Sequence, residues 1–500
     1  MKRIFLLCRD EKFLRFLLLR SFLSVLIFAL FCFVAGCNSF GERHVLIRAD
    51  FERGQIDKAK SKIDRAITSG KKGEVDVLKL NSAIIELCSG NPKSAELLLR
   101  EVRDKFDRLE RERAVDTLRD AASLLSDDTV RAYSGEDYEK VLIRVFLAIA
   151  NLMQEGADAR AYALQINDKQ NKIIQERTSE LKKWSKNNSD LTKSIAENYK
   201  QVAIGAYLSG LLQEETQQNY DEARRAYETV AAWEPDFVQA KVDLERVNSS
   251  VHSRSGNGVV YVIGLVGTGP YKLQQNCEVL RDAQIITTAL LNVTTKMNVV
   301  VDFSPIKIPV IVRSAESVPS IAVAVNAKPC GTTETITNIG QMAEDQFNVN
   351  KSQIIARAIV RRAIKKGSVL GAAEAIDANI WINIAMQLAG GIWQAVETAD
   401  TRCWNLLPAE IQIQRIELPA GLHDITLQPI SRVFSTSKKG YITTNESKYL
   451  GQKTTIPCHV VDGRNTYILA NFQNNNLVGR IVTRTDGLYH ADKETEDNKP

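Results

Sequence analysis

The stretch SSVHSRSGNGVVYVI (residues 249–263) divides this 500-residue chain into two halves of different secondary structure. Its Ser- and Gly-rich part is typical of a linker, which we place at 251–258. The five residues that follow, VVYVI, are β-branched or aromatic and predict a buried strand. The sequence therefore predicts an α+β chain, with a helical half before the linker and a β-rich half after it.

The first half, residues 37–250, has the apolar spacing of amphipathic helices. Gly54, Gly90 and Gly156 each close one helix, and a small Ala follows each of them after five residues. The best-formed helix pair is expected at 200–235. This spacing resembles the tetratricopeptide repeat and predicts a helical repeat domain, with an irregular helical bundle as the alternative. A repeat array would offer a concave surface to a protein partner, whereas a bundle would not.

The second half, residues 259–485, contains short apolar stretches separated by Gly, Pro and Asn, which indicates a sandwich-like or open-barrel β domain. The segments Ile411–Leu418 and His423–Leu427, joined by Pro-Ala-Gly, predict a β-hairpin. A helical insert is expected at about 333–400, and the polar tail at 486–500 is expected to be disordered. Further strands are expected at 298–302, 308–313, 320–326, 456–461, 466–470 and 478–483.

The helical insert contains a basic stripe followed by an apolar stretch. Ser352 can cap a helix on which a basic side chain recurs every fourth residue, opposite a row of isoleucines. One interpretation is a helical hairpin packed on the sheet and the repeats, with its basic stripe in solvent. The other is a hairpin that lies on a membrane or a partner, with the basic side chains toward anionic headgroups. The possible contact residues are Arg357, Arg361, Lys365, Trp381 and Trp393.

The N-terminus, residues 1–36, has the basic and then apolar order of an export signal. It holds six Lys and Arg and two acidic residues, so its removal lowers the net charge of the chain from +5 to +1. The signal ends in VAGC (34–37), which resembles a bacterial lipobox and predicts lipidation of Cys37; a plain signal anchor is the alternative. Asn38 after the Cys favours the outer membrane, facing the periplasm, in a Gram-negative source. The near-neutral remainder does not predict a nucleic-acid partner.

The motifs of common enzymes are missing from the sequence. The five histidines are scattered, and GLVGTG (264–269) lacks the order of a nucleotide-binding glycine loop. We therefore expect no catalysis, no cofactor, no metal and no nucleotide. Five cysteines remain in the mature chain. Either two disulfides form in the C-terminal half with Cys88 free, or, as we favour, all five are free and buried: Cys88, Cys277, Cys330, Cys403 and Cys458.

Four short motifs carry a family resemblance. They are YSGEDYE (133–139), GPYK (269–272), ADTRCWNLLP (399–408) and LPAGLH (418–423). Together with the lipobox, they resemble an uncharacterised family of bacterial tetratricopeptide-repeat envelope lipoproteins. The resemblance implies an envelope location and the domain order given above, but no active site.

Arg402 and Trp404 lie in the third of these motifs. We expect them to fill a structural junction near the strand that begins at Ile411; an exposed Trp–Arg pair that stacks on a glycan is the alternative. The sequence as a whole predicts a lipid-anchored scaffold whose helical repeats bind an unidentified envelope protein. The alternative function is a module for peptidoglycan or another glycan, centred on the β-rich domain.

Overall fold

The computed structural model defines an α+β molecule. It describes residues 40–69, 73–115, 132–154, 156–184, 201–217, 219–295, 304–314, 318–365, 399–432, 435–438, 441–444 and 448–484. Several expectations fall outside these residues: the export signal, Cys37, the strand at 298–302, Trp381, Trp393 and the tail from 486.

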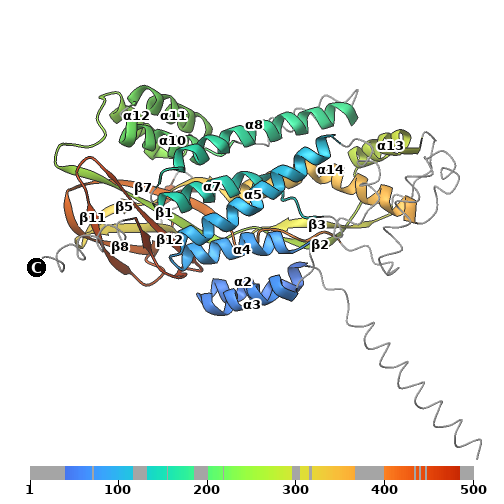
Figure 1. Cartoon of the computed structure of the whole chain (residues 1–500), viewed down its shortest axis with the longest axis horizontal. Helices are drawn as coiled ribbons and strands as arrows, with labels where there is room; N and C mark the ends of the chain where they lie inside the picture. The colour runs from blue at the N-terminus through green and yellow to red at the C-terminus, as the bar shows by residue number, and fades with distance from the viewer. Residues whose placement is uncertain are drawn as a thin grey trace, which may run out of the picture.

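The first half is helical throughout its described residues, and each helix packs against the next along the chain. In chain order the helices are α2 (Phe40–Glu52), α3 (Ile56–Ser69), α4 (Val75–Cys88), α5 (Pro92–Val115), α7 (Asp137–Leu152), α8 (Ala159–Trp184), α10 (Ile204–Leu212), the π-helix η1 (Gln213–Gln217), α11 (Tyr220–Trp233) and α12 (Val238–Val247). Figure 1 shows these helices in chain order from α2 and α3 at the bottom of the view, through α4, α5 and α7, to α8 and α10–α12 at the top.

Three helix ends carry the predicted glycines in the left-handed conformation. Gly54, Gly90 and Gly156 have φ values of 73°, 83° and 72°, which a glycine adopts without steric cost after the last turn of a helix. The alanines five residues after the first two are fully buried. Ala161, five residues after the third, is exposed, so the close-packing position predicted there is wrong.

The strands form two larger sheets and two isolated pairs. The first sheet has the order β13 (Asn476–Leu477), β12 (Asn465–Gln473), β1 (Asn257–Thr268), β7 (Pro408–Pro419) and β6 (Glu334–Asn338), and β14 (Val482–Thr483) also pairs with β12. The second sheet has the order β11 (Thr454–Val460), β8 (Gly421–Ile430), β4 (Ser320–Val325) and β5 (Lys328–Thr332). The isolated pairs are β2 (Tyr271–Cys277) with β3 (Ile306–Val312), and β9 (Ser435–Lys438) with β10 (Tyr441–Thr444).

The hairpin predicted at Ile411–Leu427 does not form, although both of its strands do. β7 pairs with β1 and β6 in the first sheet, whereas β8 pairs with β4 and β11 in the second. The chain crosses between the sheets at Ala420 and Gly421, where Gly421 has a φ of 134°. This connection resembles a hairpin in sequence because it has the same turn residues, but it joins two sheets instead of two neighbours.

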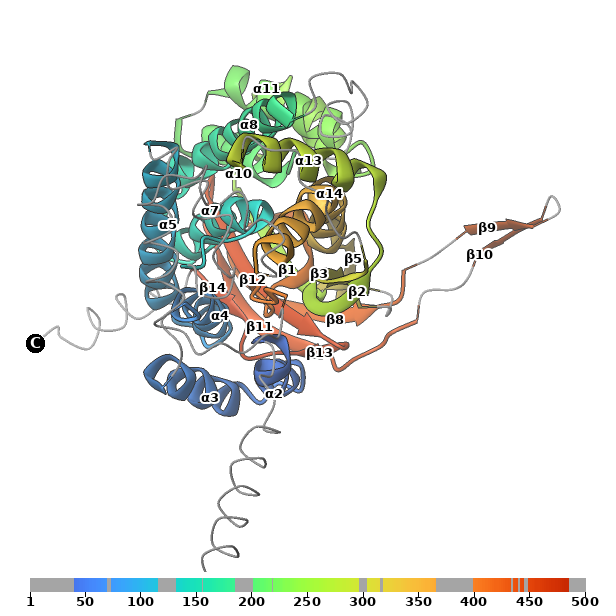
Figure 2. The same cartoon turned by 90° about the vertical axis from the view of Figure 1, so that its right-hand side faces the viewer.

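One hydrophobic core joins the helical half to the first sheet. The helices α4, α7 and α10 are buried along most of their length, and the same cluster contains Tyr261 of β1, Ile413 of β7 and Tyr467 of β12. Figure 2 shows the helices arranged around the sheets. The inner side of the helical array is therefore filled by the protein's own sheet, so the concave partner surface expected from the sequence is not available.

The segment 251–258 packs between the two halves. His252 within it is buried, and its Nε2 lies 2.8 Å from Oδ1 of Asn465 at the start of β12. The other face of the first sheet packs on the second sheet through a separate apolar cluster, which includes Val262, Ile321 and Phe472. The first sheet is thus covered on both faces, and the outer face of the second sheet points to solvent.

The last described segment, residues 476–484, runs along the glycine turns of the helical half. A Cβ on Gly54 would lie 3.7 Å from the carbonyl oxygen of Leu477, and Arg480 donates its backbone N–H to the carbonyl of Cys88 at 2.9 Å. The guanidinium of Arg484 lies 3.5 Å from the Cβ position of Gly156. Arginine near a helix C-terminus is favourable because the partial charge there is negative. This segment therefore clamps three helix ends together.

The helix of the insert begins later than predicted, because a strand precedes it. The first residues of the insert form β6, and its helix α14 (Ile339–Lys365) continues through Ser352, which therefore caps no helix. Ile355 and Ile359 are buried, as their spacing predicts, against α13 (Arg281–Thr295) and β3. None of the helices among the described residues combines the length and apolarity that a membrane span requires.

Candidate functional site

Three of the four family-like motifs meet in space at the start of α7. YSGEDYE forms the entry and first turn of this helix, GPYK opens β2, and ADTRCWNLLP leads into β7. We call the buried contact between them the polar hub; its members are Tyr133, Glu136, Glu139, Lys272, Arg402, Cys403 and Trp404. The fourth motif, LPAGLH, lies apart from the hub, at the crossing between the two sheets.

Glu139 is the centre of the polar hub and is completely buried. Its carboxylate accepts hydrogen bonds from the Tyr133 hydroxyl, from the backbone N–H of Glu136 at 2.9 Å and from the backbone N–H of Trp404 at 2.6 Å. Burial raises the pKa of Glu139, and the nearby Glu136 raises it further. One side chain thereby joins the helical layer to the strand that enters the first sheet.

Lys272 is, with Arg402, one of the two positively charged members of the hub. It is 5% exposed and forms an ion pair with Glu136. Burial by itself lowers the pKa of Lys272. The negative charges of Glu136 and Asp400 have the larger effect, so the pKa lies above its usual range. The neighbouring Gly269 donates its N–H to the carbonyl of Leu407 at 2.9 Å, and a Cβ on this glycine would lie 2.2 Å from the same oxygen. The second and third motifs are therefore in direct backbone contact.

Arg402 and Trp404 are buried in the hub. Trp404 has no exposed surface and packs against Phe146 of α7, with 5.3 Å between ring centroids. Arg402 is 3% exposed, pairs with Asp400 at 2.7 Å and donates to the carbonyl of Gly73 at 2.8 Å. A glycan that stacks on Trp404 would need an exposed ring, which this conformation does not provide. Cys403 between them is also buried, and burial raises its pKa to about 12.

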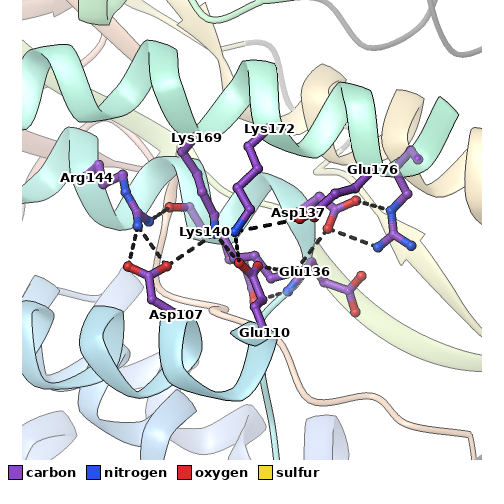
Figure 3. Close-up of polar contacts among 11 residues, drawn as sticks. Asp107, Glu110, Glu136, Asp137, Lys140, Arg144, Lys169, Lys172 and Glu176 are labelled. Atoms are coloured by element: carbon purple, nitrogen blue, oxygen red, sulfur yellow. Dashed lines mark hydrogen bonds and ion pairs between the residues drawn. The ribbon is translucent and has the colours of Figure 1, made fainter. Parts of the chain in front are cut away.

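A network of charged side chains continues from the hub between α5, α7 and α8 (Figure 3). Arg144 pairs with Asp107 at 2.7 Å, and Lys169 reaches both Asp107 at 3.2 Å and Glu110 at 2.5 Å. Lys140 binds Glu110 at 3.1 Å. Lys140 and Lys169 are at most 9% exposed, so each depends on its carboxylate partners for stability in the interior.

The carboxylates of this network have lowered pKa values. Burial raises the pKa of both carboxylates. At Asp107, the positive charges of Arg144 and Lys169 outweigh this effect and lower the pKa. At Glu110, those of Lys140 and Lys169 do the same. A carboxylate with a lowered folded-state pKa stabilises the protein above its ordinary pKa, and this contribution is lost as the pH falls through the folded-state value.

We expect the double variant Asp107→Asn/Glu110→Gln to unfold at a lower temperature than the wild type at about pH 7, with a difference that shrinks as the pH falls to about 3. Thermal unfolding followed by circular dichroism across this pH range measures the difference. Glu222→Gln, which removes a half-exposed partner of Arg225, is the control and should leave the pH profile unchanged. Parallel profiles for wild type and double variant would contradict the assignment.

The basic stripe of the insert is only partly described. Arg357 is exposed on α14. The side chains of Arg361 and Lys365, like the whole of Trp381 and Trp393, lie outside the described part of the chain.

The five cysteines that follow Cys37 are all described, and none of them forms a disulfide, as we favoured. Cys88, Cys403 and Cys458 are buried. Cys277 is half-buried and Cys330 is exposed on the edge strand β5, so the expected burial is wrong for these two. Within the described ranges, no three His, Cys, Asp or Glu side chains converge as metal ligands.

The hub was missed from the sequence because Glu139 and Lys272 looked like ordinary helix and strand residues. One signal was present: Glu136 at the N-cap and Asp137 and Glu139 in the first turn place three carboxylates at the start of a helix, where they interact favourably with its dipole. Gly135 before them has a φ of 75°, and a Cβ there would lie 2.5 Å from the ring of Phe106. This tight approach explains the glycine of YSGEDYE.

The fold and this site define a class of protein: an α+β molecule in which a helical layer is locked onto a sheet by a buried polar hub. Comparisons with protein-family models, with curated proteins and with solved structures give no match to the chain.

Proposed function

We propose that this chain is a lipid-anchored, non-catalytic scaffold of the bacterial cell envelope, of the tetratricopeptide-repeat lipoprotein kind that its motifs resemble. Cys37 would carry the lipid in the outer membrane, with the folded body in the periplasm. In this proposal the helices are a degenerate repeat array, and the two stacked sheets are a sandwich.

The polar hub is the observation that carries the scaffold proposal. The chemically distinctive side chains of three motifs are used inside the molecule, where Glu139 and Lys272 connect helices to strands. Buried polar groups with partners fix one relative position of the elements that they join. A rigid body with its polar motifs turned inward is suited to presenting surfaces to a partner.

In this proposal, the partner binds the outer helices α3, α5, α8 and α11. The inner helices α4, α7 and α10 are covered by the first sheet, so a partner of the helical layer would meet its outward side. The partner is an unidentified envelope protein; neither nucleic acid nor nucleotide is part of the proposal.

The alternative, a glycan-binding module, is supported by the outer face of the second sheet. Small or uncharged side chains such as Ala322, Ala324, Thr426 and Thr455 point outward there, and the two threonine hydroxyls are 2.8 Å apart. Retention of the full-length soluble chain on purified peptidoglycan would support this alternative over the scaffold.

The anchor is tested with the variant Cys37→Ala. We expect it to accumulate as an unprocessed precursor or to appear in the soluble envelope fraction, because the acyl chains that hold the wild type are missing. Cell fractionation and mass measurement of the N-terminus give the result, with Cys88→Ala as a control that should remain anchored. A Cys37→Ala protein that is processed normally and still membrane-bound would overturn the anchor.

A further inference from the structure

The helix α2 has apolar side chains on both of its faces. Phe40, Ile47 and Phe51 point inward and are at most 5% exposed. On the outward face, Val45 is 55% exposed and Leu46 is 61% exposed. A surface helix is normally apolar only toward the core. The neighbouring α3 follows that rule, because its exposed positions are mainly polar or charged.

The position of α2 on the folded protein is fixed by contacts with residues of two motifs that meet in the polar hub, GPYK and ADTRCWNLLP. Its Gly41 donates a backbone hydrogen bond to the Thr401 hydroxyl at 3.3 Å, and the guanidinium of Arg48 lies 3.9 Å above the ring of Tyr271. A Cβ on Gly41 would lie 3.0 Å from the carbonyl oxygen of Lys272. The outward face of α2 therefore has a set direction relative to the whole molecule.

The predicted lipid attachment site is very close to this face. Only Asn38 and Ser39 separate Cys37 from Phe40, which is the first described residue and is buried. Three residue steps span at most about 10 Å. An acyl group on Cys37 would therefore hold the start of α2 at the surface of the bilayer.

We propose that α2 lies on the bilayer into which Cys37 is acylated, with Val45 and Leu46 inserted at the headgroup boundary. This inference rests on the proposed lipid anchor. The bilayer is the occupant that the short connection to Cys37 favours, and insertion of an apolar helix face to a depth of about 5–10 Å is typical of interfacial helices. The contacts of α2 with Thr401 and Tyr271 then give the whole body one orientation on the membrane.

The test uses the full-length acylated protein reconstituted into phosphatidylcholine vesicles with brominated acyl chains. An environment-sensitive fluorescent amino acid replaces Leu46 in one sample and Val242 in another. Val242 is a matched control because it is 51% exposed and lies on α12, on the opposite side of the molecule from α2 (Figure 1). We expect the label at 46 to be blue-shifted and strongly quenched, most of all by bromines near the headgroup, and the label at 242 to be unaffected.

Three contrary results are separable. If the protein floats with the vesicles but the label at 46 behaves like the label at 242, the lipid anchor is supported and the proposal that α2 lies on the membrane is overturned. A blue shift at 46 without bromine quenching would also overturn it, because it would show that protein covers this face instead. If the protein does not float with the vesicles, the proposed anchor fails, and the inference fails with it.

Discussion

Replacement of the central carboxylate of the hub, Glu139→Ala, is expected to destabilise the protein by about 3–5 kcal/mol. The variant removes the acceptor of the buried Tyr133 hydroxyl, of the buried backbone N–H of Trp404 and of the half-buried backbone N–H of Glu136. It also leaves a cavity where the side chain was. Urea unfolding of the soluble mature chain, followed by circular dichroism, measures the loss.

Glu139→Gln is expected to lower the free energy of unfolding by about 1–3 kcal/mol. The glutamine amide keeps one acceptor oxygen, but its NH₂ group would face a hydrogen-bond donor that now binds the carboxylate. The control is Glu228→Ala on α11, which removes an exposed ion pair with Arg224 and should change stability by less than about 1 kcal/mol. If Glu139→Ala unfolds at the same urea concentration as the wild type, the hub does not hold the helices to the sheet.

Gly479→Ala is the second substitution with a large expected effect, about 3 kcal/mol or more. Gly479 has a φ of 78°, and its added Cβ would lie 2.0 Å from the carbonyl oxygen of Cys88. The segment would have to move away from α4, which breaks the hydrogen bond from Arg480 to the same carbonyl. The contacts between the segment 476–484 and the helix ends would then be lost.

Gly256→Ala is a closely matched control for this variant. Gly256 has nearly the same φ, 81°, but no atom lies within 4 Å of its Cβ position. The Gly256→Ala variant should therefore lose only the stability that corresponds to backbone strain, about 1–2 kcal/mol. Equal losses in the two variants, measured by thermal and urea unfolding, would mean that the segment 476–484 does not clamp the helices.

Much of the local structure could be predicted from the sequence because it depends on near neighbours. The helix-closing glycines Gly54, Gly90 and Gly156, the strand at 259–263 and the strand at 466–470 all follow from turn residues and apolar spacing. The strands expected at 308–313, 320–326, 411–418, 423–427 and 456–461 also appear within a few residues of their expected places, whereas β2, β5, β6, β9 and β10 were not predicted. The strand expected at 478–483 is wrong, because only the two-residue strands β13 and β14 form near it.

The arrangement of these elements could not be predicted in the same way. The turn at Pro419 to Gly421 is compatible with a hairpin or with a crossing between sheets, and only the partners of β7 and β8 decide between them. Ser352 has the chemistry of a helix cap but lies inside α14, since the buried face of that helix extends to both sides of it.

The polar hub depends on contacts between residues that are far apart in the sequence. Glu139 and Trp404 are 265 positions apart, and no local pattern connects them. The sequence did indicate a structural junction at Arg402 and Trp404. It placed this junction near the strand that begins at Ile411, but it did not indicate that the Trp404 ring packs on Phe146 of α7. The burial of one sheet face by the helices, which removes the concave surface, is likewise a long-range outcome.

Cross-linking with mass spectrometry in the native envelope tests the scaffold proposal most directly. With the full-length chain and a lysine-reactive reagent, we expect cross-links from exposed lysines of the outer helices, such as Lys58 on α3 and Lys93 on α5, to one recurrent envelope protein. Cross-links confined to the chain itself, together with retention of the protein on detergent-washed peptidoglycan, would contradict the scaffold and favour the glycan-binding module.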